Sequence, residues 1–157
     1  MNEDIKEALE VLKKGGVILY PTDTIWGIGC DATHEDAVKK IYAIKQRSEE
    51  KNLLVLLDDA SKLDRYIYEV PEIAWNLLDV TDTPLTIIYP GAQNIAKNLV
   101  AEDGSIGIRI VKDAFCSQLI RKFGKPITST SANRSGKPWP SSFNKVDSSI
   151  VNAVDYV

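Results

Sequence analysis

The chain has 157 residues, of which 44% are hydrophobic and 26% are charged, a composition typical of one globular domain. No apolar run approaches the roughly 20 residues that span a bilayer, and the acidic N-terminus does not resemble a signal peptide, so we expect a cytoplasmic protein without membrane contact. The net charge of −3 disfavours a protein that binds nucleic acid over a broad surface, although a local basic patch remains compatible with it.

The hydrophobic pattern predicts helices and strands that are mixed along the whole length, and therefore an α/β fold. Helices are expected at residues 5–12, 36–44, 71–78 and 113–121. Buried strands are expected at residues 17–20, 53–57, 85–89 and 106–110. Pro71 stands where proline is favoured in the first turn of a helix, and Asp113 can cap the last of these helices.

Cysteine and histidine are too scarce for several kinds of site. Cys30 and Cys116 are the only cysteines, and their separation argues against a disulfide scaffold or a thiolate metal site. His34 is the only histidine, which excludes a metal held by several histidines and leaves little material for a Ser-His-Asp triad. We interpret both cysteines as packing residues. His34 either caps a helix or contacts a substrate.

A polar segment follows a short apolar run late in the sequence. Residues 128–136 contain five hydroxyl side chains, one carboxamide and one guanidinium. In an extended backbone, residues two apart point the same way, so Ser131 and Asn133 would present a hydroxyl and an amide side by side. Backbone N–H groups in such a loop can form an anion-binding concavity. We expect half of a binding site here.

A second polar segment, Pro21-Thr22-Asp23-Thr24, follows the first predicted strand. Its side chains can bind a polar ligand or satisfy their own turn. Residues 27–32 also fit the loose dinucleotide pattern G-x-G-x-x-A, but the acidic partner expected roughly 20 residues later is missing, which disfavours that interpretation.

Lys45 and Arg47 follow the helix predicted at residues 36–44. Val38, Ile41 and Lys45 share one helical face, so the Lys45 stem can continue a buried stripe and bring its ammonium to a cavity. Both cations can share a ligand only if the helix ends near Lys45 and the chain then becomes extended. The spacing also fits cations that merely complement the helix dipole.

Arg109 lies in the strand predicted at residues 106–110. It alternates with Ile108 and Ile110 and should therefore face the side opposite these two apolar residues. In isolation this pattern fits a functional arginine and an ordinary solvated one equally well.

Taken together, these segments resemble the YrdC family, the L-threonylcarbamoyladenylate synthases. The resemblance covers nearly the whole chain and rests on an ordered set of motifs. They are Pro21-Thr22-Asp23-Thr24, the K-x-R of Lys45 and Arg47, Pro84-Leu85-Thr86, the G-x-R of Gly107 and Arg109, and S-T-S-A-N-x-S-G at residues 129–136.

The resemblance implies a twisted, mainly open mixed sheet with flanking helices and a concave basic cavity. It implies a nucleotidyltransferase that uses ATP with Mg²⁺, L-threonine and bicarbonate or CO2 to make L-threonylcarbamoyl-AMP and pyrophosphate. This is the first step of threonylcarbamoyladenosine modification of tRNA, so downstream transfer proteins are implied as partners. No protein-bound structural metal is expected, because magnesium would be held mainly by phosphates and water.

The same resemblance assigns roles to residues. Lys45 and Arg47 would be catalytic and would offset phosphate and carboxylate charge, while Ser131 and Asn133 would hold the nucleotide phosphates. Arg109 would line the nucleotide side of the ATP-binding site.

The resemblance also implies which residues bind the amino-acid substrate. Thr22, Thr24 and Arg47 would orient L-threonine in the threonine-binding part of the site.

The chain departs from the family in two places. Ser48 and Asn52 stand where the family commonly has prolines, which makes this connection freer before binding. Family members usually continue past the strand suggested at residues 154–157, so we expect residues 1–157 to form a single YrdC-like domain without the usual C-terminal tail.

Two other functions remain open from the sequence. The first is a non-catalytic RNA-binding or ribosome-associated protein that uses the same cavity to contact tRNA or double-stranded RNA, for which the acidic balance is unfavourable. The second is a carbamoyl-phosphate-processing domain of hydrogenase maturation, which the absence of acylphosphatase-like and zinc-finger segments disfavours.

Overall fold

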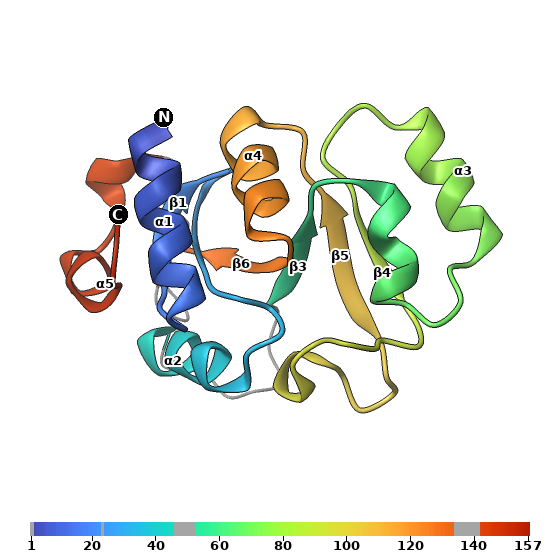
Figure 1. Cartoon of the computed structure of the whole chain (residues 1–157), viewed down its shortest axis with the longest axis horizontal. Coiled ribbons are helices and arrows are strands. Elements are labelled where there is room, and N and C mark those ends of the chain that lie inside the picture. The colour runs from blue at the N-terminus through green and yellow to red at the C-terminus, as the bar shows by residue number, and fades with distance from the viewer. Residues whose placement is uncertain (1, 23, 46–52, 134–141) are drawn as a thin grey trace.

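The computed structural model describes residues 2–22, 24–45, 53–133 and 142–157, and Figure 1 shows their arrangement. A six-stranded mixed sheet has the order β1-β2-β6-β3-β5-β4. The strands are β1 (Ile18–Pro21), β2 (Trp26–Gly29), β3 (Leu54–Leu57), β4 (Thr86–Tyr89), β5 (Ile106–Ile110) and β6 (Ile127–Ser131). The α-helices are α1 (Asn2–Lys13), α2 (Glu35–Lys45), α3 (Glu72–Val80), α4 (Ala114–Phe123) and α5 (Ser148–Ala153). Short 3₁₀ helices are η1 (Ala60–Arg65), η2 (Lys97–Leu99) and η3 (Phe143–Lys145).

Antiparallel pairing dominates the sheet. Only β3 and β5 run parallel, and β6 lies antiparallel between β2 and β3. The register brings Ser129 opposite Leu54 on β3, and Gly27 opposite Ser131. This central position of β6 joins the first and last thirds of the chain.

The two faces of the sheet carry separate apolar clusters. Helices α1 and α4 lie side by side over one face, where Ile5 and Leu119 pack with Leu56 of the sheet (Figure 1). The larger cluster occupies the opposite face and includes Val38 and Ile41 of α2. Alternating residues of β1 and β3 therefore belong to different clusters, as a pleated strand between two helical layers requires.

The predicted α/β class is confirmed, and all four predicted strands and all four predicted helices are present with shifted ends. Two strands were not predicted, β2 and β6, and the strand suggested at residues 154–157 is only an isolated bridge between Tyr156 and Ile18. The prediction for Pro71 was wrong, because Pro71 is the N-cap of α3 with ψ of 143° and the helix starts one residue later. The prediction for Asp113 is confirmed, since its carboxylate accepts a hydrogen bond of 2.9 Å from the backbone N–H of Cys116.

Close approach of β6 requires a glycine in β2. A Cβ atom at Gly29 would lie 2.4 Å from the Thr128 carbonyl oxygen and 2.8 Å from Cε1 of Tyr20. Tyr20 is fully buried there, and its hydroxyl donates a 2.9 Å hydrogen bond to the same carbonyl oxygen. Burial raises the pKa of Tyr20 well above its usual value.

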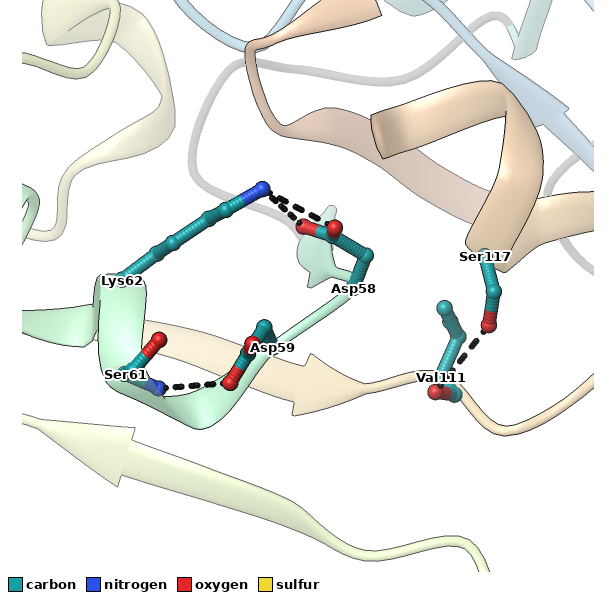
Figure 2. A network of polar contacts seen from close by, with 6 residues as sticks. All are labelled: Asp58, Asp59, Ser61, Lys62, Val111 and Ser117. Carbon is teal, nitrogen blue, oxygen red and sulfur yellow. Dashed lines mark hydrogen bonds and ion pairs between the residues drawn. The ribbon is translucent and has the colours of Figure 1, made fainter. Parts of the chain in front are cut away.

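A polar network fixes the chain at the end of β3 that is remote from Leu54. Asp59 accepts a 2.9 Å hydrogen bond from the backbone N–H of Ser61, which caps η1, and Asp58 forms an ion pair of 2.9 Å with Lys62. Figure 2 shows both contacts. The hydrogen bonds from Ser61 hold the pKa of the exposed Asp59 below its usual value. These contacts fix the chain where β3 ends and η1 begins.

None of the helices formed by the described residues is long and apolar enough to cross a membrane.

Candidate functional site

The helix α2 delivers Lys45 to the interior. Ala37, Val38, Ile41 and Lys45 are its buried face, and Lys45 is 0% exposed although it is the last helical residue. The apolar stem continues the buried stripe, so the ammonium group emerges beyond the packed part of the helix. The helix predicted at residues 36–44 corresponds to α2.

Three oxygen atoms from the end of β6 accept hydrogen bonds from Lys45. Its Nζ atom lies 2.7 Å from the Ser131 carbonyl oxygen, 3.3 Å from Ser131 Oγ and 3.2 Å from Asn133 Oδ1. All three acceptors are neutral oxygen atoms, and these contacts fix the direction of the ammonium group. The buried position makes them stronger than the same contacts in water.

Ser131 and Asn133 lie side by side. The Ser131 hydroxyl donates to Asn133 Oδ1, and the backbone N–H of Asn133 donates to the Ser131 carbonyl oxygen at 2.9 Å. Asn133 is buried, while Ser131 is half-buried at the end of its strand. The expected pairing of a hydroxyl with an amide is thus found, on a strand end and not in a free loop.

The turn after β1 lies next to this cluster. Gly27 pairs with Ser131, and a Cβ atom at Gly27 would lie 3.5 Å from Cγ2 of Thr22 and 3.3 Å from Ser129 Oγ. The glycine leaves room between the turn and β6.

The Thr22 hydroxyl satisfies its own turn. It donates to the Ile25 carbonyl oxygen at 2.6 Å and accepts from the backbone N–H groups of Thr24 and Ile25 at 3.1 and 3.2 Å. Of the two interpretations of this segment, the self-satisfied turn describes Thr22. Thr24 is exposed, and its hydroxyl lies 3.0 Å from that of Thr22.

A hollow of about 640 Å³ extends from β3 towards β4. Its floor includes Leu54, Gly107 and Ile88, which are neighbours across the sheet, and Leu54 is also the register partner of Ser129. The hollow therefore begins one strand away from the strand that carries Ser131. The loop around η2 borders it on the other side.

Arg109 is buried on the face covered by α1 and α4. It is the register partner of Leu56 and of Thr86, and it lies opposite the face on which Ile108 packs, as predicted from alternation. Its charge lowers the pKa of Tyr20, although burial outweighs this effect. Standard strand and residue spacings put its Cα roughly 16 Å from that of Ser131.

Thr86 was quoted in the sequence motifs without a role. The structure places it, exposed, beside Arg109 on the edge strand and in the wall of the hollow. A threonine directly after a Pro-Leu pair at the start of a strand was the available signal. Proline marks a strand start at a sheet edge, where a polar side chain can meet a ligand.

Several predicted features lie outside the described residues. They are Asp23 of the Pro21-Thr22-Asp23-Thr24 motif, Arg47, residues 134–136 of the late polar segment, and Ser48 and Asn52 at the positions of the family's prolines.

His34 caps α2. Its Nδ1 atom accepts a 3.1 Å hydrogen bond from the backbone N–H of Ala37, the third residue of the helix. This contact favours the capping interpretation over contact with a substrate.

The two cysteines are buried free thiols. Burial raises the pKa of Cys30 to about 12, although the neighbouring Thr128 hydroxyl opposes this shift. Both cysteines are therefore packing residues in the described part of the chain.

Residues 10–157 match the model of the Sua5/YciO/YrdC family, which is described by the words "telomere recombination". The chain belongs to this family. Its fold class is that of the family, a mixed sheet flanked by helices. The YrdC resemblance recognised in the sequence is confirmed.

Named relatives of the Sua5/YciO/YrdC family cover most of the chain. A threonylcarbamoyl-AMP synthase of Pseudoalteromonas translucida is 33% identical over 97% of this chain and 83% of its own length. One from Vibrio cholerae is 34% identical over 87% of this chain and 74% of its own. These similarities support an enzyme of the nucleotidyltransferase type.

A solved structure has the same fold as this chain. The crystal structure of P. abyssi Sua5 in complex with L-threonine superposes with a TM-score of 0.90 at 27% identity. The match covers 97% of this chain and 45% of that protein, so this chain spans less than half of the Sua5 length.

Proposed function

We propose that this chain makes L-threonylcarbamoyl-AMP from L-threonine, bicarbonate or CO2 and ATP, and releases pyrophosphate. The observation that carries the proposal is the meeting of Lys45 with Ser131 and Asn133 at the end of β6. Relatives at 33–34% identity carry the name threonylcarbamoyl-AMP synthase, which supports the same chemistry here.

The reaction needs no covalent enzyme intermediate. The threonine amine adds to CO2 and loses a proton, which gives a carbamate. A carbamate oxygen then attacks the α-phosphorus of ATP, the bond to the bridging oxygen breaks, and pyrophosphate leaves with the electron pair. Such a sequence depends on positioning and on preorganised positive charge rather than on a nucleophilic side chain.

The cluster at the end of β6 would hold the phosphate chain. Lys45 supplies a cation whose direction is fixed by the Ser131 carbonyl oxygen, and Ser131 Oγ and Asn133 supply further polar groups at the strand end. Arg47 would add a second cation. The rest of the nucleotide would extend over the hollow towards Arg109. The Cα atoms of Ser131 and Arg109 are roughly 16 Å apart, a distance that a nucleotide can bridge and a single phosphate cannot.

L-Threonine would lie against the turn of Thr22 and Thr24. The P. abyssi Sua5 structure was obtained with L-threonine, which supports an amino-acid site in this fold. Since Thr22 orders its own turn, its contribution would be to shape that turn, and Thr24 would contact the substrate.

Magnesium would enter with ATP. Among residues 2–22, 24–45, 53–133 and 142–157, no group of three or more His, Cys, Asp or Glu side chains could hold a metal ion. The phosphates and water would then supply the ligands. We further propose that the product passes to proteins that modify tRNA, in the cytoplasm.

The test is pyrophosphate release from ATP by the purified chain. Release should require both L-threonine and bicarbonate, and Lys45→Met should lower its rate at least tenfold, since about 1.4 kcal/mol of lost transition-state stabilisation has that effect. Lys39→Met is the matched control, because Lys39 lies exposed on the same helix.

Circular dichroism and thermal unfolding of each variant separate a lost site from a lost fold. Release that does not depend on threonine would contradict the proposed reaction. Equal rates for folded Lys45→Met and Lys39→Met would contradict the assigned site and leave the reaction open.

A further inference from the structure

The helix α3 is more apolar than its packing requires. Ala74 is buried, and Trp75 and Leu78 pack against the larger core cluster. Three further apolar side chains, Ile73, Leu77 and Val80, are 66%, 41% and 80% exposed. Surface helices normally turn a polar face to water, so this helix has a second apolar face without a partner among the described residues.

The exposed residues form one continuous ridge. Ile73, Leu77 and Val80 follow the i, i+4, i+7 spacing that aligns side chains along a helix. Of the seven large hydrophobic residues exposed in the described part of the chain, five lie between residues 68 and 88. Clustering of this kind marks an interaction surface, whereas single exposed apolar residues are ordinary.

The neighbouring ridge is acidic. Glu72, Asn76 and Asp79 share the same spacing one residue earlier, and all three are exposed. Residues 66–96 contain four carboxylates and no lysine, arginine or histidine. Lys112 reaches the C-terminal end of α3, where its Nζ donates to the Thr81 carbonyl oxygen at 2.9 Å, and it leaves the ridge itself unneutralised.

A hollow of about 620 Å³ adjoins the start of the helix. Glu69, Glu72 and Tyr68 line it, and Tyr68 is 80% exposed. The backbone N–H of Tyr68 donates to the Gly91 carbonyl oxygen at 2.8 Å, which ties the hollow to the loop after β4. Two carboxylates beside an aromatic ring suit a lysine or arginine side chain.

We propose that this α3 surface, the apolar ridge with its acidic neighbour and the adjoining hollow, docks a partner protein through a basic amphipathic helix. The partner would lay apolar side chains along Ile73, Leu77 and Val80, with lysine or arginine residues facing Glu72 and Asp79. Figure 1 places α3 beyond the edge strand β4, at the end of the molecule opposite both termini and α2. A partner can therefore bind here without covering Lys45.

Charge decides among the possible occupants. The phosphates of an RNA would meet the carboxylates of Glu69, Glu72 and Asp79 and would be repelled. A second copy related by a two-fold axis would bring its own acidic ridge to the same interface, which like charges disfavour. A basic helix satisfies both the apolar ridge and the carboxylates.

The probe is a pair of synthetic helical peptides of about 18 residues, or five turns, with the same leucine face. One carries lysine on its polar face and the other carries glutamate. Amide chemical shifts of the ¹⁵N-labelled full chain should move at residues 68–82 with the lysine peptide. The glutamate peptide should bind roughly tenfold more weakly or worse.

Two charge-reversal variants provide the matched comparison. Glu72→Lys/Asp79→Lys should reverse the peptide preference, whereas Glu7→Lys/Glu10→Lys changes the net charge equally on exposed positions of α1 and should not. Leu77→Ser should weaken binding of the lysine peptide without lowering pyrophosphate release.

Four results would overturn the proposal, and the first three concern the peptides and the oligomeric state. They are shifts centred on α1, equal binding of the two peptides, and a Leu77-dependent dimer in sedimentation, which would make a second copy the occupant. Shifts at residues 68–82 on addition of tRNA would also overturn it.

Discussion

Lys45 and Ser131 are 86 residues apart in sequence, and the Lys45 ammonium group donates to both the carbonyl and the hydroxyl oxygen of Ser131. One cation thus holds the end of the central strand β6 against the end of α2. The contact is at once structural and part of the proposed phosphate site, so its two contributions should be separable by measurement.

The first prediction concerns the energetic coupling of this pair. Lys45→Met, Ser131→Ala and the double variant should show non-additive changes in the free energy of unfolding, with a coupling of about 0.5–2 kcal/mol. The reason is that each single change removes the 3.3 Å contact between Lys45 Nζ and Ser131 Oγ, so the second change has less of it left to lose. Urea unfolding measures all three values, and additivity within about 0.3 kcal/mol would contradict a direct contact.

The second prediction concerns the cap of α2. His34→Ala should lower the free energy of unfolding by about 0.5–2 kcal/mol, because the Ala37 backbone N–H loses its acceptor. His34→Asn should recover most of the loss, since asparagine is a preferred N-cap.

Threonine-dependent pyrophosphate release should persist in both folded His34 variants. A large rise in the KM for threonine in His34→Asn, at unchanged stability, would instead assign His34 to substrate binding.

The third prediction concerns the contact of β2 with β6. Gly29→Ala should destabilise the chain by about 1–3 kcal/mol, because the added carbon meets the Thr128 carbonyl oxygen at 2.4 Å and the backbone must shift. Gly107→Ala is the matched control for stability. Its Cβ would meet Cγ2 of Thr86 at 3.4 Å, an ordinary contact, so its change should stay within about 1 kcal/mol. Equal melting temperatures for the two variants would contradict the described packing.

The fourth prediction concerns alkaline pH. Burial raises the pKa of Cys30 from 9.0 to about 12, so the folded state disfavours the thiolate. The stability due to this neutral thiol is fully present below pH 9 and is lost as the pH rises towards about 12. Cys30→Ala should therefore show a flatter decline of unfolding free energy above pH 9 than the unaltered chain.

Alkylation offers an independent check on Cys30. Iodoacetamide should modify it in urea and leave it intact in the folded chain at pH 8. Rapid modification of the folded chain would contradict its buried, protonated state.

The sequence predicted those elements whose residues are apolar on one side. Ile5, Ala8 and Leu12 define α1, and Ile106 and Ile108 define one face of β5, because burial of a periodic stripe is a local property. The strand β6 was missed because three of its four buried residues are polar, namely Thr128, Ser129 and Thr130. Thr128 is acceptable inside the sheet since its hydroxyl accepts from the Cys30 backbone N–H at 3.0 Å, a contact 98 residues away that no local pattern reveals.

Some features of the site could likewise be predicted from the sequence, and others could not. The spacing of Val38, Ile41 and Lys45 predicted that the lysine would follow the buried face of α2, and the two-residue spacing of Ser131 and Asn133 predicted their adjacency. That these groups meet followed only from the family resemblance, because contacts across 86 residues depend on the sheet order. The preference of Thr22 for its own turn required coordinates, since a hydroxyl can serve a turn or a ligand equally well.

A crystal structure with L-threonine and an ATP analogue that resists cleavage at the α-phosphorus tests the central claim most directly. The account predicts the triphosphate within hydrogen-bond distance of Lys45 Nζ and Ser131 Oγ, with the nucleoside extending over the hollow towards Arg109. A triphosphate bound elsewhere, with the groups at the end of β6 untouched, would contradict it.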